Sequence, residues 1–186
     1  LRRAIGTVPR VRLVFADGDM PTGDWSAGDG GSFVPGTEIT LAAGYDDDET
    51  EVFRGIVVTL GMRIGAGNVS ELIVDCRDKA IKMTVGRRNE VHVGKTDSDI
   101  IKGLVSRHGL TAKADSTAVQ HKELLQYYCT DWDFLLARAE ANGLLVIVSD
   151  GEVSVRAPQT SASPALSVEW GADLIGLEAA VPIVAF

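Results

Sequence analysis

Apolar and polar residues alternate with a period of two through the first part of the chain, which predicts β-strands. This alternation covers residues 11–15, 37–43, 51–60 and 71–76, with turn-rich segments between the runs. Within the longest run, the pattern predicts one shared face, formed by Val52, Ile56, Val58 and Leu60. Four or five short strands in 78 residues favour an antiparallel sheet that curls into a small β-barrel.

Beyond residue 78 the period changes to 3.6, which predicts a helix. Thr96 and Asp99 have the spacing of a capping box, and the apolar stripe that follows ends at Gly109. The stripe consists of Ile100, Ile101, Leu104, Val105 and His108. The residues from 110 to 125 are polar, and we predict no element there.

The stretch from Gln126 to Arg156 has the most readable pattern. Thr130 with Asp133 predicts the start of a second helix, and Asn142-Gly143 predicts its end. The buried face of this helix would be formed by Trp132, Leu135, Leu136 and Ala139. A β-branched and leucine run at 144–149, the pair Asp150-Gly151 and an alternating run at 152–156 then predict a hairpin with a type I′ turn.

The predicted fold class is α+β, mainly antiparallel β, in three parts. Residues 1–93 form a first small β-barrel, residues 94–158 a helix and β-hairpin insertion, and residues 159–186 a linker with the first strands of a second β-barrel. Those strands are predicted at 166–170 and 174–180. Only 16 residues follow Trp170, so we expect that the chain is trimmed at its ends or that other strands complete this barrel.

Three sequence segments together resemble the phage late control protein D family, which includes the hub portion of VgrG-type spike proteins. These are Gln126–Gly143, with its Thr-Asp-Trp-Asp-Phe-Leu core, Phe33–Gly44 and Phe53–Val57. Their order and spacing match from about Val11 to Ala179. The resemblance implies a baseplate hub protein of a phage tail or contractile injection system, assembled in the bacterial cytoplasm.

The resemblance also implies the partners and the assembly. Members form homotrimers in which two similar barrels per subunit make a ring of six, which matches a threefold spike to a sixfold tube. The expected partners are further copies of the chain, the tail tube protein, a spike domain or spike tip protein, and other baseplate components. No cofactor and no enzymatic activity are implied.

Composition and charge narrow the function classes. The chain is 45% apolar and 24% charged, as in ordinary soluble globular proteins, and no apolar run is long enough to span a membrane. A net charge of −8 argues against specific nucleic acid as a partner. Residues 79–125 carry 9 basic and 5 acidic side chains between two acidic flanks. This basic middle indicates either contact between neighbouring copies or ordinary solvated charge.

The strongest enzyme alternative uses paired carboxylates. Asp131, Asp133 or Glu140 could serve as acid and base in a tail-associated peptidoglycan hydrolase. The two aspartates lie at the start of a predicted helix, however, where the helix dipole lowers the pKa of a carboxyl group. Neither aspartate is therefore suited to act as a general acid at neutral pH. A free-standing ligand-binding domain is the third alternative. We predict no catalytic, cofactor-binding or metal residues.

Several other residues could have either a functional or a structural role. Asp46–Glu49 is either a metal site or a solvated hairpin tip, and it lacks the spacing of a calcium loop. Gly28–Gly31 is Gly-rich, but no helix pattern follows it as a phosphate-binding loop requires. The remaining candidates for ligation, acid-base chemistry or ligand stacking, each more commonly structural, are His92, His108, His121, Cys76, Cys129, Trp25, Trp132 and Phe134.

Overall fold

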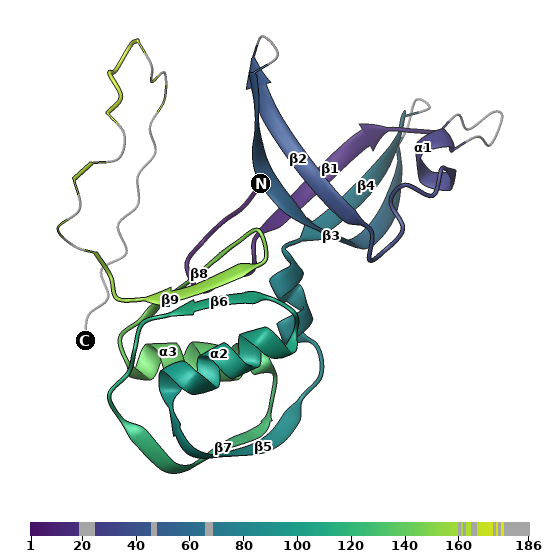
Figure 1. The fold of residues 1–186 in the computed structure, drawn as a ribbon. Helices are drawn as coiled ribbons and strands as arrows, with labels where there is room; N and C mark the ends of the chain where they lie inside the picture. The colour runs from purple at the N-terminus through teal and green to yellow at the C-terminus, as the bar shows by residue number, and fades with distance from the viewer. Residues whose placement is uncertain are drawn as a thin grey trace.

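The computed structural model describes residues 1–18, 25–45, 48–65, 69–159, 161, 163–164, 167–172, 174 and 176. The described strands lie in three sheets, and nearly all of the strand pairs are antiparallel. The α+β class is therefore confirmed. Figure 1 shows an open curled sheet standing on a second unit that holds the two longer helices.

The first sheet contains four strands in the order β1-β4-β3-β2. They span Arg10–Ala16 (β1), Glu38–Tyr45 (β2), Asp48–Gly65 (β3) and Val69–Arg77 (β4), and a short helix α1 covers Ser26–Asp29. The edge strands β1 and β2 do not pair with each other, so the predicted closed barrel is wrong for the described residues. The reason is the length of β3: its first half pairs with β2 and its second half with β4, so the two hairpins diverge.

The predicted buried face of β3 is wrong before a β-bulge and right beyond it. The register against β4 shifts between Val57 and Thr59, which places one extra residue in β3 and reverses the alternation beyond it. Before the bulge, the core takes Phe53 and Val57, each 1% exposed, in place of the predicted Val52 and Ile56. Beyond it, Leu60 lies opposite the buried Val74, on the core side as predicted, while Val58 at the bulge is 39% exposed. Sequence alternation could not show this change of face because it assumes an uninterrupted strand.

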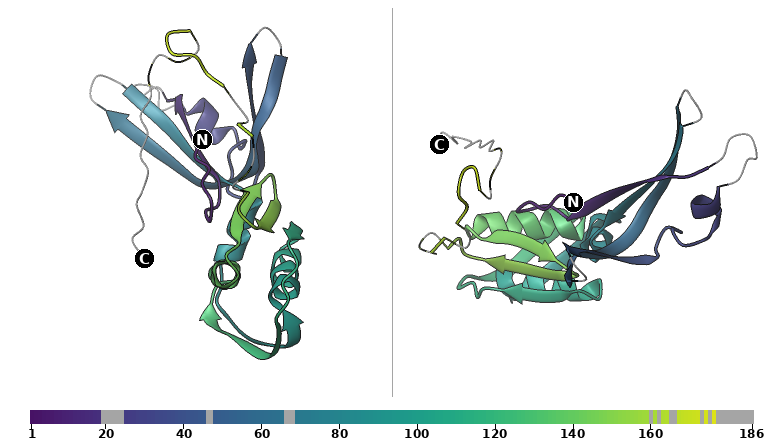
Figure 2. Two further views of the ribbon diagram at one scale, coloured as in Figure 1. Left: turned by 90° about the vertical axis from the view of Figure 1, so that its left-hand side faces the viewer. Right: turned by 90° about the horizontal axis from the view of Figure 1, so that it is seen from above.

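The second unit repeats one strand-helix-strand order twice. The first copy is β5 (Arg88–Thr96), α2 (Asp97–Arg107) and β6 (Thr111–Ala114), and the second is β7 (Gln120–Cys129), α3 (Asp131–Ala141) and β8 (Leu145–Ser149). Strand β9 (Glu152–Arg156) then pairs with β8 in antiparallel and with β6 in parallel orientation, while β5 pairs with β7. Figure 2 shows the two helices packed between these sheets.

Both predicted helices and the predicted hairpin are confirmed. Thr96 and Thr130 cap α2 and α3 as expected, and Asp150 and Gly151 have the positive φ angles, 53° and 80°, of a type I′ turn. Trp132, at 7% exposed, belongs to the core of this unit. Strands β5, β6 and β7 were not predicted, and β6 with half of β7 lies in the stretch read as polar.

The two units meet at Asp78, between two separate hydrophobic cores. One core is built from residues 11–76 and the other from residues 80–155. Asp78 caps the 3-10 helix η1 (Lys79–Thr84) by accepting from Ala80 N at 2.8 Å, and its other oxygen accepts from Gly151 N at 3.0 Å. The cores thus divide between Cys76 and Ala80, while the three domain ranges stay a prediction.

The strand predicted at 166–170 is wrong for its described residues, because 167–169 have no regular structure. The strand predicted at 174–180 lies outside the described residues except for 174 and 176. Within the described part, Trp170 forms an isolated parallel bridge with Leu174. The predicted linker at 159–164 is also described only in part. A search of the described helices finds none with the length and apolar character needed to cross a membrane.

We expect Leu135→Ala to destabilise the second unit, because Leu135 is fully buried between α3 and the rest of that core. The free energy of unfolding should fall by about 2–5 kcal/mol, the usual cost of such a cavity. Urea denaturation followed by circular dichroism measures it. Glu140→Ala on the exposed side of α3 is the matched control, and a loss below about 1 kcal/mol for Leu135→Ala would contradict the packing described.

Candidate functional site: surfaces for protein contacts

Asp131, the leading catalytic candidate from the sequence, is enclosed by partners. Its carboxylate accepts from Gln126 Nε2 at 2.9 Å and lies 2.8 Å from His108 Nε2. Arg107 Nη1 and Arg88 Nε approach the same carboxylate at 3.2 and 3.5 Å. With 2% of its side chain exposed, Asp131 offers no free oxygen to a substrate.

The pKa of Asp131 agrees with this structural role. Burial by itself raises the pKa, but the hydrogen bonds from Gln126 and His108 and the charges of Arg107 and Arg88 outweigh burial and lower it. A carboxyl held ionised in this way cannot donate a proton at neutral pH. The low pKa expected for Asp131 from the sequence is therefore confirmed, although ion pairs contribute to it beside the helix terminus.

Asp97 occupies the equivalent position at the start of α2, and its partners lie at the end of α3 and on β7. Arg138 Nε donates to its carboxylate at 2.7 Å, Asn142 Nδ2 donates at 2.9 Å, and His121 Nε2 lies 3.1 Å away. Burial raises the pKa of Asp97, and the hydrogen bonds from Arg138, Asn142 and His121 lower it by more. Each helix thus begins at an aspartate that the end of the other helix neutralises.

The other candidate residues are not assembled into a reacting centre. Asp133 accepts from the Thr130 hydroxyl at 2.7 Å as part of the helix cap, and Glu140 is exposed on the far side of α3. His92 is buried and stacks on Phe134, with ring centroids 5.5 Å apart. Trp132 and Phe134 lie in the core rather than forming a ligand platform.

The metal and thiol candidates also find no common site. In the part of the chain that the structure describes, no three His, Cys, Asp or Glu residues are placed to hold a metal ion. Asp46 and Asp47 of the acidic run lie outside that part. Burial raises the pKa of the thiols of both Cys76 and Cys129, which makes them poor nucleophiles.

An exposed apolar surface on the inner face of the first sheet is the first candidate contact surface. Leu60, Met62 and Ile64 of β3 are 38%, 57% and 53% exposed. They lie opposite Val74, Leu72 and Ser70 of β4, so their side chains share the face that forms the core nearer the bulge. We call these three residues the open face. Exposed apolar groups gathered on one sheet face are typical of a protein contact.

A cavity of about 360 Å³ adjoins the open face. It is lined by Trp25, Gly28, Asp29, Leu60, Gly61, Met62 and Leu72. The helix α1 forms one wall, and Asp17 holds α1 in place by accepting from the backbone of Ala27 and Gly28 at 3.1 and 2.9 Å. Trp25, left open in the sequence as a contact residue, therefore lines a recess next to the open face.

A second apolar surface lies on the outer side of the β5-β7 ribbon. Val91, Val93, Leu125 and Tyr127 are between 52% and 76% exposed, and the ladder places Val91 opposite Leu125. The inner positions of the same ribbon include the polar residues His92 and Gln126, which are 3% and 0% exposed, beside Leu124, which packs on the core. The usual polarity of a half-buried strand is thus partly inverted. The sequence shows the alternation of Val91, His92 and Val93, which was the available signal for β5.

Comparisons with known proteins identify one family and several related folds. A model of the family described as "Alg8 N-terminal domain" matches residues 1–183. No curated protein sequence matches. Among solved structures, the 43 kDa tail protein of prophage MuSo2 from Shewanella oneidensis has a TM-score of 0.58 at 14% identity, over 79% of this chain and 44% of that one.

Two further structures have a similar fold. The E. coli c3393 protein, described as a type VI secretion component similar to the T4 tail proteins gp27 and gp5, has a TM-score of 0.58 at 13% identity, over 82% of this chain and 42% of that one. A tail protein from Neisseria meningitidis MC58 has a TM-score of 0.52 at 17% identity, over 84% and 48%. The chain thus spans less than half of each structure, and such low identity establishes a shared fold alone.

We expect acid to destabilise the protein through Asp97 and Asp131. Their pKa values are lowered in the folded state, so the stability they provide is present above the unfolded pKa of about 3.9 and is lost as the pH falls through the lower folded values. Urea denaturation at pH 7, 5, 4 and 3 should show the free energy of unfolding falling below about pH 4.

The double variant Asp97→Asn, Asp131→Asn tests the cause of this loss. It should be less stable than the wild type at pH 7, because the facing arginines lose their counter-charge, and its stability should change less between pH 4 and 3. Val119→Thr, at an exposed and uncharged position, should keep the wild-type profile. An unchanged acid transition in the double variant would contradict the assignment.

Proposed function

We propose a function from two premises: the chain belongs to the Alg8 N-terminal domain family, and its fold is shared with phage tail proteins and a type VI secretion component. The chain is a structural baseplate hub or spike component of a phage tail or contractile injection system. This proposal agrees with the late control protein D and VgrG-type resemblance of its sequence. The site of action is the baseplate, which is assembled in the bacterial cytoplasm.

The hub proposal includes a homotrimer that adapts a spike to a hexameric tail tube. Three copies that each present two tube-like units give six equivalent docking positions. The first curled sheet is one such unit, and the second would follow residue 159. The tail tube protein would contact one side of the ring, with a spike domain or spike tip protein and other baseplate components on the other.

The open face is the observation that carries this proposal. Leu60, Met62 and Ile64 form an apolar strip on a sheet whose edge strands do not close into a barrel. A monomer would leave this strip and the free edges in water, which is a known route to unwanted association. A neighbouring subunit that covers the strip would remove this cost. Self-assembly is therefore the simplest function that uses the exposed residues.

The two alternatives have less support. A tail-associated peptidoglycan hydrolase would need a free acid and base, but Asp131 is saturated by ion pairs and Asp133 caps its own helix. A free-standing ligand-binding domain would use the cavity beside α1, whose walls include Leu60 and Met62 of the open face. A contact between subunits would cover that cavity.

Self-association is the first expected outcome. Light scattering during size-exclusion chromatography should give a trimer of about 59 kDa for the 186-residue chain, three times its mass of 19.8 kDa. The trimer should form because each copy buries the apolar strip of the next. A mass of 19.8 kDa that persists at high protein concentration would contradict the hub proposal, and saturable ligand binding by that monomer would favour the third alternative.

A charge on the open face should prevent this association. Met62→Lys places an ammonium on the strip, where a neighbouring subunit could not bury it without loss. We expect a shift from trimer to monomer with little change in the unfolding midpoint, since Met62 is 57% exposed in the single chain. Val34→Lys, at a site that is 54% exposed away from the strip, is the matched control. Equal trimer content in both variants would exclude the open face as the contact.

The enzyme alternative is tested directly with purified peptidoglycan. We expect no release of soluble fragments by the wild type beyond that of a buffer control, because Asp131 is enclosed by ion pairs and Asp133 caps its own helix. Turnover that is lost in the variant Asp133→Asn, Glu140→Gln would establish the hydrolase instead. A hydrolase would also retain activity in the monomeric Met62→Lys variant if the site lies within one chain.

A further inference from the structure

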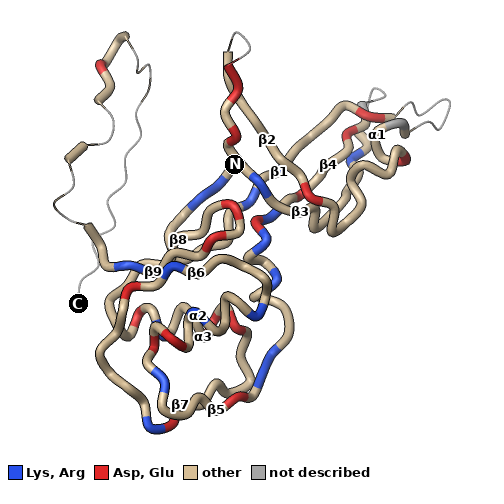
Figure 3. Tube along the Cα trace, in the orientation of Figure 1, with Lys and Arg blue, Asp and Glu red and all other residues tan. Residues whose placement is uncertain are grey.

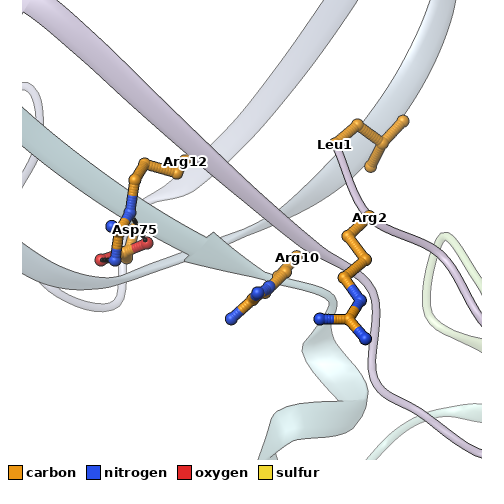
Figure 4. A pocket seen from close by; sticks show the side chains of 5 residues that line it. All are labelled: Leu1, Arg2, Arg10, Arg12 and Asp75. Atoms are coloured by element: carbon orange, nitrogen blue, oxygen red, sulfur yellow. Dashed lines mark hydrogen bonds and ion pairs between the residues drawn. The ribbon is translucent and has the colours of Figure 1, made fainter.

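A row of arginines lines the outer face of the first sheet where β1 begins and β4 ends. The backbone of Arg2 forms an isolated antiparallel β-bridge with that of Arg10, and Arg10 lies directly opposite Arg77 where β1 pairs with β4. Two adjoining cavities of about 270 and 220 Å³ share Arg2 and Arg10 as lining residues. Figure 4 shows the side chains of Arg2 and Arg10 beside those of Arg12 and Asp75. We call Arg2, Arg10 and Arg77 the arginine row.

The arginine row has more positive charge than its surroundings neutralise. Asp75 lines the larger of the two cavities, and Arg12 engages it with two hydrogen bonds of 2.9 Å. Arg10 and Arg77 act on this carboxylate only through their charge, as smaller contributions to its lowered pKa. No ion pair joins Arg2, Arg10 or Arg77 to any residue that the structure describes. Three guanidinium groups without an ion pair to a described residue thus lie close together, in a chain with a net charge of −8. Guanidinium groups match carboxylates in shape and charge.

The end of the β2–β3 hairpin has the complementary charge. Asp48 and Glu49, at the start of β3, are both exposed there. Neither Asp48 nor Glu49 forms an ion pair with a described residue. Figure 3 shows acidic segments on this hairpin and basic segments where β1, β4 and η1 meet. One chain therefore presents an unpaired acidic end and an unpaired basic row.

These two surfaces cannot meet within one chain. Ile56 of β3 pairs with Arg77, and Asp48 lies at the start of the same strand, eight residues away. At about 3.3 Å per residue, this strand holds Asp48 about 25 Å from Arg77. Within the described part of the chain the strand keeps the two surfaces apart, so another molecule can supply the partner of each.

We propose that the arginine row of one copy binds the acidic end of the β2–β3 hairpin of a neighbouring copy. The proposal rests on the proposed self-assembly and names a contact within it. The two surfaces are different parts of the molecule, so the contact is heterologous and runs head to tail. Heterologous contacts close into rings when the rotation between copies allows it. A threefold ring would use each row and each hairpin end once.

The test is a charge swap that is read as oligomeric state in sedimentation equilibrium. Variant one carries Arg10→Glu and Arg77→Glu, variant two carries Asp48→Lys and Glu49→Lys, and variant three carries all four changes. Variants one and two should each weaken self-association by about tenfold or more at low salt. Variant three should recover wild-type association because the contact is restored with reversed signs.

Matched controls separate a local contact from net charge and from misfolding. Lys122→Glu with Arg156→Glu changes the net charge as variant one does, at two exposed positions outside the row, and should leave association unchanged. Each variant is also checked for its thermal unfolding midpoint, and recovery in variant three shows in addition that the single reversals did not destroy the fold.

The outcomes distinguish this proposal from the proposed function. A wild type that stays monomeric overturns the hub assembly, and the contact with it. A wild-type trimer that persists in variant one overturns the arginine contact alone. Loss of association in variant one without recovery in variant three overturns the hairpin as the occupant and favours another acidic partner.

Discussion

The arrangement of the two units depends on the carboxylate of Asp78. One oxygen caps η1 and the other accepts from Gly151 in the β8–β9 turn, while the backbone amide of Asp78 donates to Pro9 O at 3.0 Å. A single buried side chain thus fixes where β4 ends, where the second core begins and where the hairpin turn sits. The N-terminal segment adds a bond from Gly6 N to Val146 O. The arginine row is adjacent because Arg77 directly precedes Asp78, so this joint also fixes the position of that surface.

Within the second unit, the end of each of the helices α2 and α3 neutralises the buried aspartate at the start of the other. Each helix begins with a threonine cap and a buried aspartate, and Arg107 of α2 reaches Asp131 while Arg138 of α3 reaches Asp97. An aspartate favours a helix start and an arginine favours a helix end, so both dipoles are satisfied by the same two ion pairs. Removal of either partner would leave a buried charge, which generally costs about 3–5 kcal/mol. This reciprocity requires antiparallel helices, because the start of each helix must lie beside the end of the other.

Sequence patterns predicted the elements that are stabilised by neighbouring residues. They failed where contacts between distant segments determine the register or the burial of a strand. The caps at Thr96 and Thr130 and the Asp150-Gly151 turn depend on neighbouring residues, so they could be read directly. The bulge at Val57 could not, because it is set by the register against β4. Strand β7 was missed because its buried position Gln126 is polar and its exposed positions Leu125 and Tyr127 are apolar. The sequence indicated the low pKa of Asp131 but not its ion pairs with Arg107 and Arg88. The arginine row is distributed over three segments and has no sequence motif.

The inverted ribbon and the open face have a common physical consequence. The His92 ring stacks on Phe134 and the Gln126 amide donates to Asp131. Both ring nitrogens of His92 and the Gln126 Oε1 nevertheless lack a hydrogen-bond partner among the described residues, so burial of these two side chains adds little to stability. The apolar side chains of the ribbon lie instead on its outer side, where only a partner molecule would bury them. The first sheet has the same character, with Leu60 and Met62 on one face and Arg10 and Arg77 on the other. A sheet with an apolar face and a basic face suits a subunit held between two different neighbours, since each face favours a different surface.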